Sequence, residues 1–294
     1  MTDASPRADL HEGFRDPLRA DPAALTDFLD EVDRLPGVRA VHRAIRRSLG
    51  IRPGMRVLDA GCGIGLEVTR LARQHPDADF TGLDQNPELL RTARRRAVPP
   101  PPNLTWVHAA LETSGLAEGS YDAVRTERVL MYAPGPLFGE LLDLLVRLLR
   151  PGGRLVLFEL DYGATMLSPG PDGDTLVRPL EDLLHQALPQ PLAGRKIPLE
   201  LTARGMAEVA AVPFSFSVNE PVWRRIVHDT LRLALEREPG ERGPGERGPG
   251  ERGPGEGKSG GRDELRSWLE AQAAAAHDSP FLAAFTGVLT TARR

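Results

Sequence analysis

Three glycines and one acidic residue form the part of this sequence whose types and spacing could do chemistry. Gly61, Gly63 and Gly65 alternate directly after a short apolar run, and a segment with helical spacing follows them. Glycine accepts positive φ and has no Cβ, so a ligand can lie against the backbone of such a turn. Asp84 ends the next apolar run, where a carboxylate can accept hydrogen bonds from ribose hydroxyls. This spacing predicts a site for a cofactor that carries a nucleoside.

Asp59 stands two residues before the first glycine and favours a cationic cofactor over a dinucleotide. A carboxylate there attracts an ammonium or sulfonium group, whereas it would repel a pyrophosphate. The pattern from Asp59 to Gly65 resembles motif I of the class I S-adenosylmethionine-dependent methyltransferases, of the ubiquinone-biosynthesis-like small-molecule type. The resemblance continues through residues 119–124 and 148–155 and covers about residues 50–165.

The resemblance implies S-adenosylmethionine as the cofactor, with Asp84 at the ribose and Asp59 near the amino-acid end of the cofactor. Many relatives carry an aspartate in the loop after the third strand, where this chain has alanine. Backbone groups of Ala110 and Leu111 would then hold the adenine, with Glu112 as a substitute. The candidate cofactor-binding residues are Asp59, Gly61, Cys62, Gly63, Gly65, Asp84, Gln85, Ala110, Leu111 and Glu127.

Residues after the predicted strands supply the candidates for catalysis. Glu127 and Arg128 would either touch the cofactor and the substrate or simply form an ion pair. Asp161 and Tyr162 follow the predicted fifth strand at the same edge of the sheet, and they are candidate general bases together with His185. His228, on a predicted helix of the last third of the chain, is a further candidate base, and Glu159 is expected in the same crevice as Asp59, Asp84 and Glu127. Because the seven histidines and the single cysteine show no metal-ligand spacing, we expect no metal, and Cys62 is expected to pack within the glycine turn.

These side chains require a sheet whose strands end at one edge. Strands alternate with helices from residue 55 onward, which predicts parallel pairing with right-handed crossovers. We therefore expect a Rossmann-like doubly wound α/β fold with a mostly parallel seven-stranded sheet and an antiparallel last strand, as the resemblance also implies. The expected strands are residues 55–60, 79–84, 104–107, 122–126, 154–160, 208–218 and 281–292, and the expected helices are residues 65–74, 87–97, 136–149, 175–188, 220–237 and 262–277.

The chain divides into three expected parts. Residues 1–50 form a helical segment that either covers the active site or packs on the sheet, residues 51–165 form the cofactor-binding core, and residues 166–294 complete the sheet with helical insertions that cap the site. Within the last part, the sequence Glu-Arg-Gly-Pro-Gly occurs three times, so residues 239–261 are expected to be a disordered linker.

The composition excludes some classes of partner and of location. The net charge is −4 and no basic stretch alternates with aromatic residues, so no nucleic-acid partner is expected. No apolar stretch would span a membrane, and we expect a cytoplasmic protein. The leading interpretation is a methyltransferase acting on a small molecule, with secondary metabolism as one expected setting. A cofactor-binding protein of the same fold without methyl transfer remains an alternative, and a nicotinamide-dependent dehydrogenase is disfavoured by Asp59.

Overall fold

A seven-stranded sheet organises the computed structural model, which describes residues 13–14, 21–168, 176–218, 222, 232, 235, 260–274 and 282–294. The strand order is β3-β2-β1-β4-β5-β7-β6. Strands β1 to β5 pair in parallel, while β7 runs antiparallel to both β5 and β6, between which it lies. The strands are β1 (Arg56–Ala60), β2 (Asp79–Asp84), β3 (Leu104–His108), β4 (Tyr121–Glu127), β5 (Leu149–Ser168), β6 (Ala207–Ser217) and β7 (Leu282–Arg293). The expected Rossmann-like α/β fold is confirmed.

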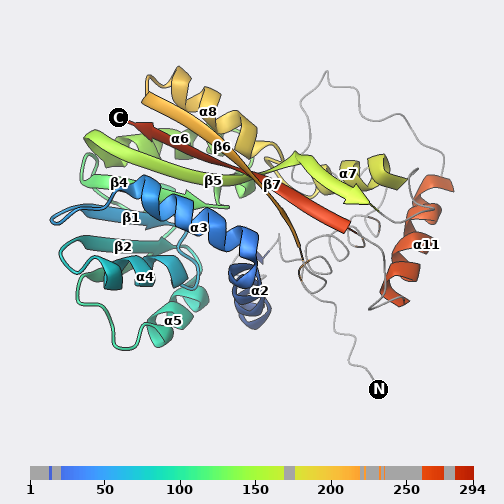
Figure 1. The fold of residues 1–294 in the computed structure, drawn as a ribbon, viewed down its shortest axis with the longest axis horizontal. Coiled ribbons are helices and arrows are strands. Elements are labelled where there is room, and N and C mark those ends of the chain that lie inside the picture. The colour runs from blue at the N-terminus through green and yellow to red at the C-terminus, as the bar shows by residue number, and fades with distance from the viewer. Residues whose placement is uncertain are drawn as a thin grey trace.

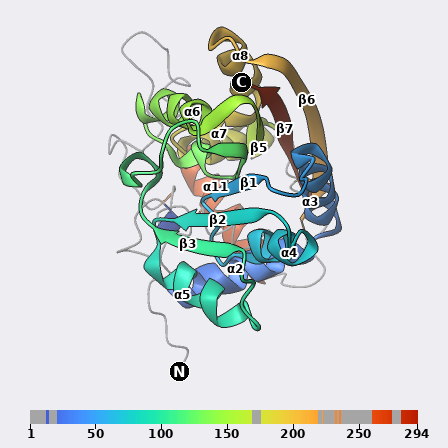
Figure 2. The same ribbon diagram turned by 90° about the vertical axis from the view of Figure 1, so that its left-hand side faces the viewer.

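Helices cover the two faces of this sheet (Figures 1 and 2). On one face lie α3, which packs on β5, β6 and β7, and α4, which packs on β2 and β3. On the other face α6 packs on β4 and β5, and α8 packs on β5, β6 and β7. The helices are α2 (Pro22–Arg34), α3 (Pro36–Leu49), α4 (Leu66–Gln74), α5 (Pro87–Arg96), α6 (Leu137–Leu148), α7 (Val177–Gln186), α8 (Ala193–Ala203) and α11 (Gly260–Ala274). None of these described helices is both long and apolar enough to cross a bilayer.

Local sequence signals fix where the helices next to the site begin and end. Asn86 caps α5, because its side-chain oxygen accepts hydrogen bonds from the backbone N–H groups of Glu88 and Leu89, and Pro87 occupies the first helical position. Asp21 caps α2 in the same way. Gly50 ends α3 in the left-handed conformation, with φ +56°.

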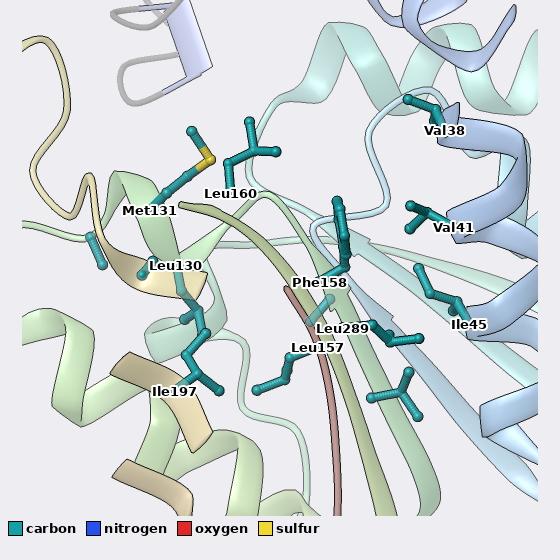
Figure 3. Packing of buried hydrophobic residues seen from close by; sticks show 14 of the residues in the cluster. Val38, Val41, Ile45, Leu130, Met131, Leu157, Phe158, Leu160, Ile197 and Leu289 are labelled. Atoms are coloured by element: carbon teal, nitrogen blue, oxygen red, sulfur yellow. The ribbon is translucent and has the colours of Figure 1, made fainter. Parts of the chain in front are cut away.

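The core lies on both faces of the sheet. Figure 3 shows Val38, Val41 and Ile45 pointing from α3 towards Phe158 of β5 and Leu289 of β7. On the opposite face, Leu157 points towards Ile197 of α8 (Figure 3). Successive strand residues thus face opposite layers, and β5 is buried on both sides because it lies in the middle of the sandwich.

Two elements differ from the expectation. Strand β5 continues past residue 160 to Ser168, and its pairing with β7 shifts between Asp161 and Met166. Asp161 and Tyr162 therefore lie within a strand, not after one. Helix α8 was not expected, since Pro198 interrupts its pattern. The expected helix over residues 220–237 and the expected linker over residues 239–261 fall almost entirely outside the described residues, although α11 already begins at Gly260.

Candidate functional site

A cavity of about 600 Å³ lies where the carboxyl ends of β1, β2 and β4 meet. Such an edge is where open α/β sheets bind ligands. One half of the cavity is formed by the glycine turn and the ends of β2 and β3, and the other half by the chain after β4 together with β5 and α6. The lining residues include Phe14, Phe28, Gly61, Gly63, Asp84, Gln85, Ala109, Leu111, Glu112, Glu127, Arg128, Val129, Met131, Tyr132, Leu137, Leu160 and Tyr162.

The glycine turn is held against the end of β2. The N–H groups of Gly61 and Cys62 donate to the carbonyl of Leu83, at 2.8 and 2.9 Å. Gly61 has φ +77°, and a Cβ on it would collide with the side chain of Val129. Gly63, with φ +55°, lines the cavity. Both positions therefore need glycine, the first for space and conformation and the second for conformation.

Asp84 connects this turn to the cavity. Its Oδ2 accepts a hydrogen bond from the Gly63 N–H at 2.7 Å, and its Oδ1 accepts one from the Asn86 N–H at 2.8 Å. Burial raises the pKa of Asp84, and these N–H donors oppose the shift. Each carboxylate oxygen can accept a second hydrogen bond, and the residue lines the cavity. The carboxylate can therefore hold hydroxyl groups of a ligand.

The structure brings only part of the predicted set to this cavity. The predicted residues that line it are Gly61, Gly63, Asp84, Gln85, Leu111, Glu127 and Tyr162. Asp59 and Cys62 line a smaller adjoining cavity of about 90 Å³, which also contacts Gly61, Gly63 and Glu127. Burial raises the pKa of the Cys62 thiol, which suits a packing role.

The other predicted site residues do not line the large cavity. Gly65 is the N-cap residue immediately before α4, with φ +70°, and a Cβ there would collide with the ring of Trp106. Asp161 turns to α8, where its Oδ2 accepts from Arg195 Nε at 2.6 Å. His185 lies on α7 and lines neither cavity. Ala110 is likewise absent from both linings, although its neighbours Ala109 and Leu111 line the large cavity. His228 lies outside the described residues.

Asp59 faces a buried arginine, Arg125, which is not among the predicted site residues. Its Oδ2 lies 2.8 Å from Arg125 Nη1, and Arg125 Nη2 lies 2.7 Å from Glu127 Oε2. Burial raises the pKa of Asp59 to about 6, although Arg125 acts in the opposite direction. Arg125 lies within the expected strand over residues 122–126, and nothing local in the sequence identifies its partner. Register pairs it directly with Asp59, and alternation places it on the same side as Glu127.

His42 of α3 extends this charged network. Its Nε2 lies 3.1 Å from Glu127 Oε2, and its Nδ1 lies 3.3 Å from Asp33 and 3.4 Å from Glu67. Burial alone would lower the pKa of His42, but the three carboxylates raise it to about 9. Despite burial, the cationic groups of His42, Arg128 and Arg125 hold the pKa of Glu127 well below its usual range. The imidazole is therefore a cation at neutral pH.

Asp33, His42 and Glu67 also place possible metal-ligand atoms within 4.8 Å of one another. Glu67 is already paired with Arg46 Nη1 at 2.7 Å and with Arg70. Two guanidinium groups and a protonated imidazole account for the carboxylates of this cluster by charge pairing alone. Within the described residues, the cluster thus has the character of an ion-pair network.

Glu159 lies behind the cavity instead of within it. The residue is 0% exposed and accepts hydrogen bonds from the N–H groups of Val129 and Leu130, both at 2.9 Å, and of Met131 at 3.2 Å. Burial raises its pKa to about 7 against the effect of these donors. It lines neither cavity, so the expectation that it shares the crevice is corrected.

The half of the cavity beyond the glycine turn is mostly apolar. Tyr162 lines it from β5, packs edge-on against Phe285 at 5.5 Å between ring centroids, and has its pKa raised by burial. Phe14 reaches over from the N-terminal side, with its ring 5.6 Å from that of Tyr132 and its carbonyl accepting from Gln85. Among the lining residues that the structure describes, Arg128 is the only cation. This half suits a ligand with a large apolar surface.

Helices α2 and α3, which precede β1, contact different parts of the structure. Phe28 and Leu29 of α2 line the cavity, whereas α3 packs on the sheet. The structure thus builds part of the cavity wall from the segment before β1.

Comparison with known proteins identifies a domain family and two relatives that resemble this chain. Residues 57–153 match the methyltransferase domain family. The chain is 36% identical over 139 residues to an uncharacterized 37.1 kDa protein in transposon Tn4556 of Streptomyces fradiae, covering 46% of this chain and 39% of that protein. It is 36% identical over 125 residues to the ubiquinone biosynthesis O-methyltransferase of Xanthomonas campestris, covering 42% of this chain and 49% of the relative. The chain thus matches less than half the length of these relatives.

Solved structures share the fold at low identity. Phosphoethanolamine N-methyltransferase 2 of Haemonchus contortus, solved with S-adenosyl-L-methionine, has a TM-score of 0.55 and 16% identity over 97% of this chain and 60% of its own. The YcgJ protein of Bacillus subtilis has a TM-score of 0.55 and 14% identity over 87% of this chain and 98% of its own.

Proposed function

We propose that this chain, whose residues 57–153 match the methyltransferase domain family, is a class I S-adenosylmethionine-dependent methyltransferase that moves a methyl group from this cofactor to a small-molecule acceptor. The observation that carries the proposal is Asp84, a buried carboxylate that holds the Gly63 N–H and still has acceptor capacity on the wall of the cavity. A ribose needs such a group, and a glycine turn leaves room beside it.

The chain's own residues fit that cofactor. Asp84 and Gln85 would hold the ribose, and Leu111 with Glu112 would border the base where the aspartate of many relatives is missing. Gly61 and Gly63 would pass beneath the amino-acid end, near Glu127 and Arg128. When bound, S-adenosylmethionine supplies a methyl group on a cationic sulfonium.

Asp59 contributes to this end of the site through its ion pair. Since Arg125 neutralises its charge, Asp59 acts by fixing Arg125 and, through it, Glu127. Glu127, which lines both cavities, would be the carboxylate that faces the cofactor's cationic groups.

The apolar half of the cavity would hold the acceptor. Its contribution is to exclude water and to align the acceptor, which lowers a displacement barrier by restricting orientation. Tyr162 is the residue of the predicted catalytic set that we retain, because it lines this half. We do not retain Asp161, which is engaged by Arg195, or His185, which lies away from the cavity.

Calorimetric titration with S-adenosylhomocysteine tests the cofactor site. Asp84→Asn should weaken binding at least 10-fold, since a hydrogen bond to a charged group is worth about 1.5–3 kcal/mol. Asp143→Asn is a matched control, because Asp143 is a half-exposed carboxylate paired with Arg204 on the surface. Equal affinity of wild-type protein and Asp84→Asn would remove the basis of the proposal.

A second candidate function has one observation in its favour. Apart from Tyr162, whose pKa burial raises, the described residues that line the acceptor half include no histidine, lysine or unpaired carboxylate that could act as a general base. A protein that binds the cofactor without transferring its methyl group would have no need of one. Release of S-adenosylhomocysteine from S-adenosylmethionine, followed across a panel of apolar alcohols, phenols and amines, separates the two functions.

A further inference from the structure

One buried carboxylate holds the chain segment that forms much of the cavity wall. This segment, residues 128–134, is named here the post-β4 segment. Glu159 lies about 30 residues away in sequence and accepts the N–H groups of three consecutive residues, Val129, Leu130 and Met131. The three N–H groups point at one carboxylate because the segment turns tightly there, as the short 3₁₀ helix Leu130–Tyr132 shows.

Backbone hydrogen bonds also hold the segment, and within it the Tyr132 and Ala133 N–H groups donate to the carbonyls of Val129 and Leu130, both at 3.1 Å. The Arg128 N–H donates to the carbonyl of Phe158 at 2.8 Å, and the Met131 carbonyl accepts from the Gln190 N–H at 3.1 Å. An N–H group that is buried without an acceptor destabilises the conformation that buries it. Without the Glu159 carboxylate, this turn would leave several such groups.

The segment needs this support because its first residue has an unfavourable backbone conformation. Arg128 has φ +55°, a region that residues with a Cβ rarely adopt. A conformation of this kind persists only where neighbouring bonds determine it, and such residues cluster at ligand sites. Here the determining bonds are those of Phe158 and Glu159 on the neighbouring strand β5.

The segment contributes to both halves of the cavity. Val129 lies directly against Gly61 of the glycine turn, and Arg128 lines the large cavity as well as the smaller one. The segment also supplies much of the apolar half. Its lining residues are Arg128, Val129, Met131, Tyr132, Ala133 and Pro134.

We propose that Glu159 is a positioning residue of this site: by binding three consecutive backbone N–H groups, it fixes the post-β4 segment in the conformation that presents Arg128 and Val129 to the cofactor half and Met131 and Tyr132 to the acceptor half. The proposal rests on the proposed methyltransferase function. Glu159 itself touches neither cavity, so its effect passes through the backbone.

Glu159→Gln tests this role in the full chain. The amide has one acceptor oxygen and an NH₂ group, so at least one N–H of the turn loses its acceptor and faces another donor. We expect amide hydrogen exchange of a peptide covering residues 128–134 to rise at least 10-fold, with β1 and β2 peptides unchanged. We also expect the dissociation constant for S-adenosylhomocysteine, measured by calorimetry, to rise at least 10-fold.

Two further variants separate positioning from general loss of stability. Leu201→Ala removes a fully buried α8 side chain that lines neither cavity, so it should lower Tm while the dissociation constant changes less than twofold. Glu159→Asp keeps the charge with a shorter reach and should show a smaller loss of affinity than Glu159→Gln. It also takes the place of Glu159→Gln if that variant does not fold.

The possible results distinguish a failure of the positioning role from a failure of the proposed methyltransferase function. Wild-type binding together with a Glu159→Gln affinity within twofold of wild type would overturn the positioning role alone. Similar losses of affinity in Leu201→Ala and Glu159→Gln would overturn it too, since stability would then explain both. Wild-type protein that binds no S-adenosylhomocysteine would refute the proposed function and, with it, the positioning role.

Discussion

His42 should make the stability of this protein depend on pH well above the range in which histidines ordinarily titrate. The imidazole is 5% exposed and has Glu127, Asp33 and Glu67 within 3.4 Å. Burial opposes its charge, yet the carboxylates raise its pKa from 6.5 to about 9. The perturbation to apply is therefore a rise in pH from 6 to 10.

The sign and the size of the effect follow from proton linkage. Below pH 6.5 both the folded and the unfolded chain bind the proton, and the stabilisation by His42 is fully present. As pH rises through 9, the folded state loses the proton and the stabilisation is lost. At about 1.4 kcal/mol for each pH unit between the two pKa values, the loss amounts to about 3 kcal/mol. Because the side chain is almost fully buried, solvent screening reduces this value little.

Urea unfolding of wild-type protein and His42→Gln at several pH values measures the effect. Glutamine stays neutral, so the difference between the two free energies of unfolding isolates His42 from other groups that titrate above pH 8. We expect that difference to shrink by about 3 kcal/mol between pH 6 and pH 10. A constant difference, or an NMR titration that puts the His42 pKa near 6.5, would refute the reasoning.

Two other changes probe the glycine turn and the ion pair beside it. Gly65→Ala should lower the free energy of unfolding by about 2–3 kcal/mol, because of the positive φ and the collision with Trp106. Gly119→Ala is the control, at a similar φ with open space around it, and should lower it by only about 1 kcal/mol. Equal losses for the two variants in urea unfolding would argue against the collision. Asp59→Asn should cost about 3 kcal/mol because it leaves Arg125 with a single buried carboxylate. In a double-mutant cycle, Asp59→Asn with Arg125→Met should cost clearly less than the sum of the single changes, and strict additivity would contradict the pairing.

Glycine and proline residues at the ends of helices and strands made much of the fold predictable. Glycine and proline bound β1, α4, β2 and α5, and these elements lie within one or two residues of their expected positions. The end of β5 was not predictable in this way, because its last residues are strand only through pairing with β7. Helix α8 was not predicted because Pro198 disfavours a helix at this position. The helix forms nevertheless, since burial of Ile197 and Leu201 outweighs the unfavourable proline.

The site residues likewise divide into those that local sequence predicts and those that it does not. The glycine turn and Asp84 are local motifs, since turn conformation and a strand end can be recognised from neighbouring residues. Arg125, His42 and Glu159 act through partners 66, 85 and about 30 residues away in sequence. For Glu159, a charged residue in an apolar run was the available signal, but the partner of such a residue depends on register and packing, which a single sequence does not specify.

The place of β7 between β5 and β6 constrains the order in which the chain can fold. Strands β1 to β5 are consecutive and pair mostly with near neighbours, so this half can assemble first. Among the described strands, β6 pairs only with β7, and β7 follows the other six strands in chain order. Until β7 pairs, one edge of β5 stays open, and an open edge invites pairing with other chains. Joining Arg154 to Arg293 also closes a loop of well over a hundred residues, which is a slow step. Completion of the sheet is therefore expected to be late, and it is the stage at which this protein is most exposed to aggregation.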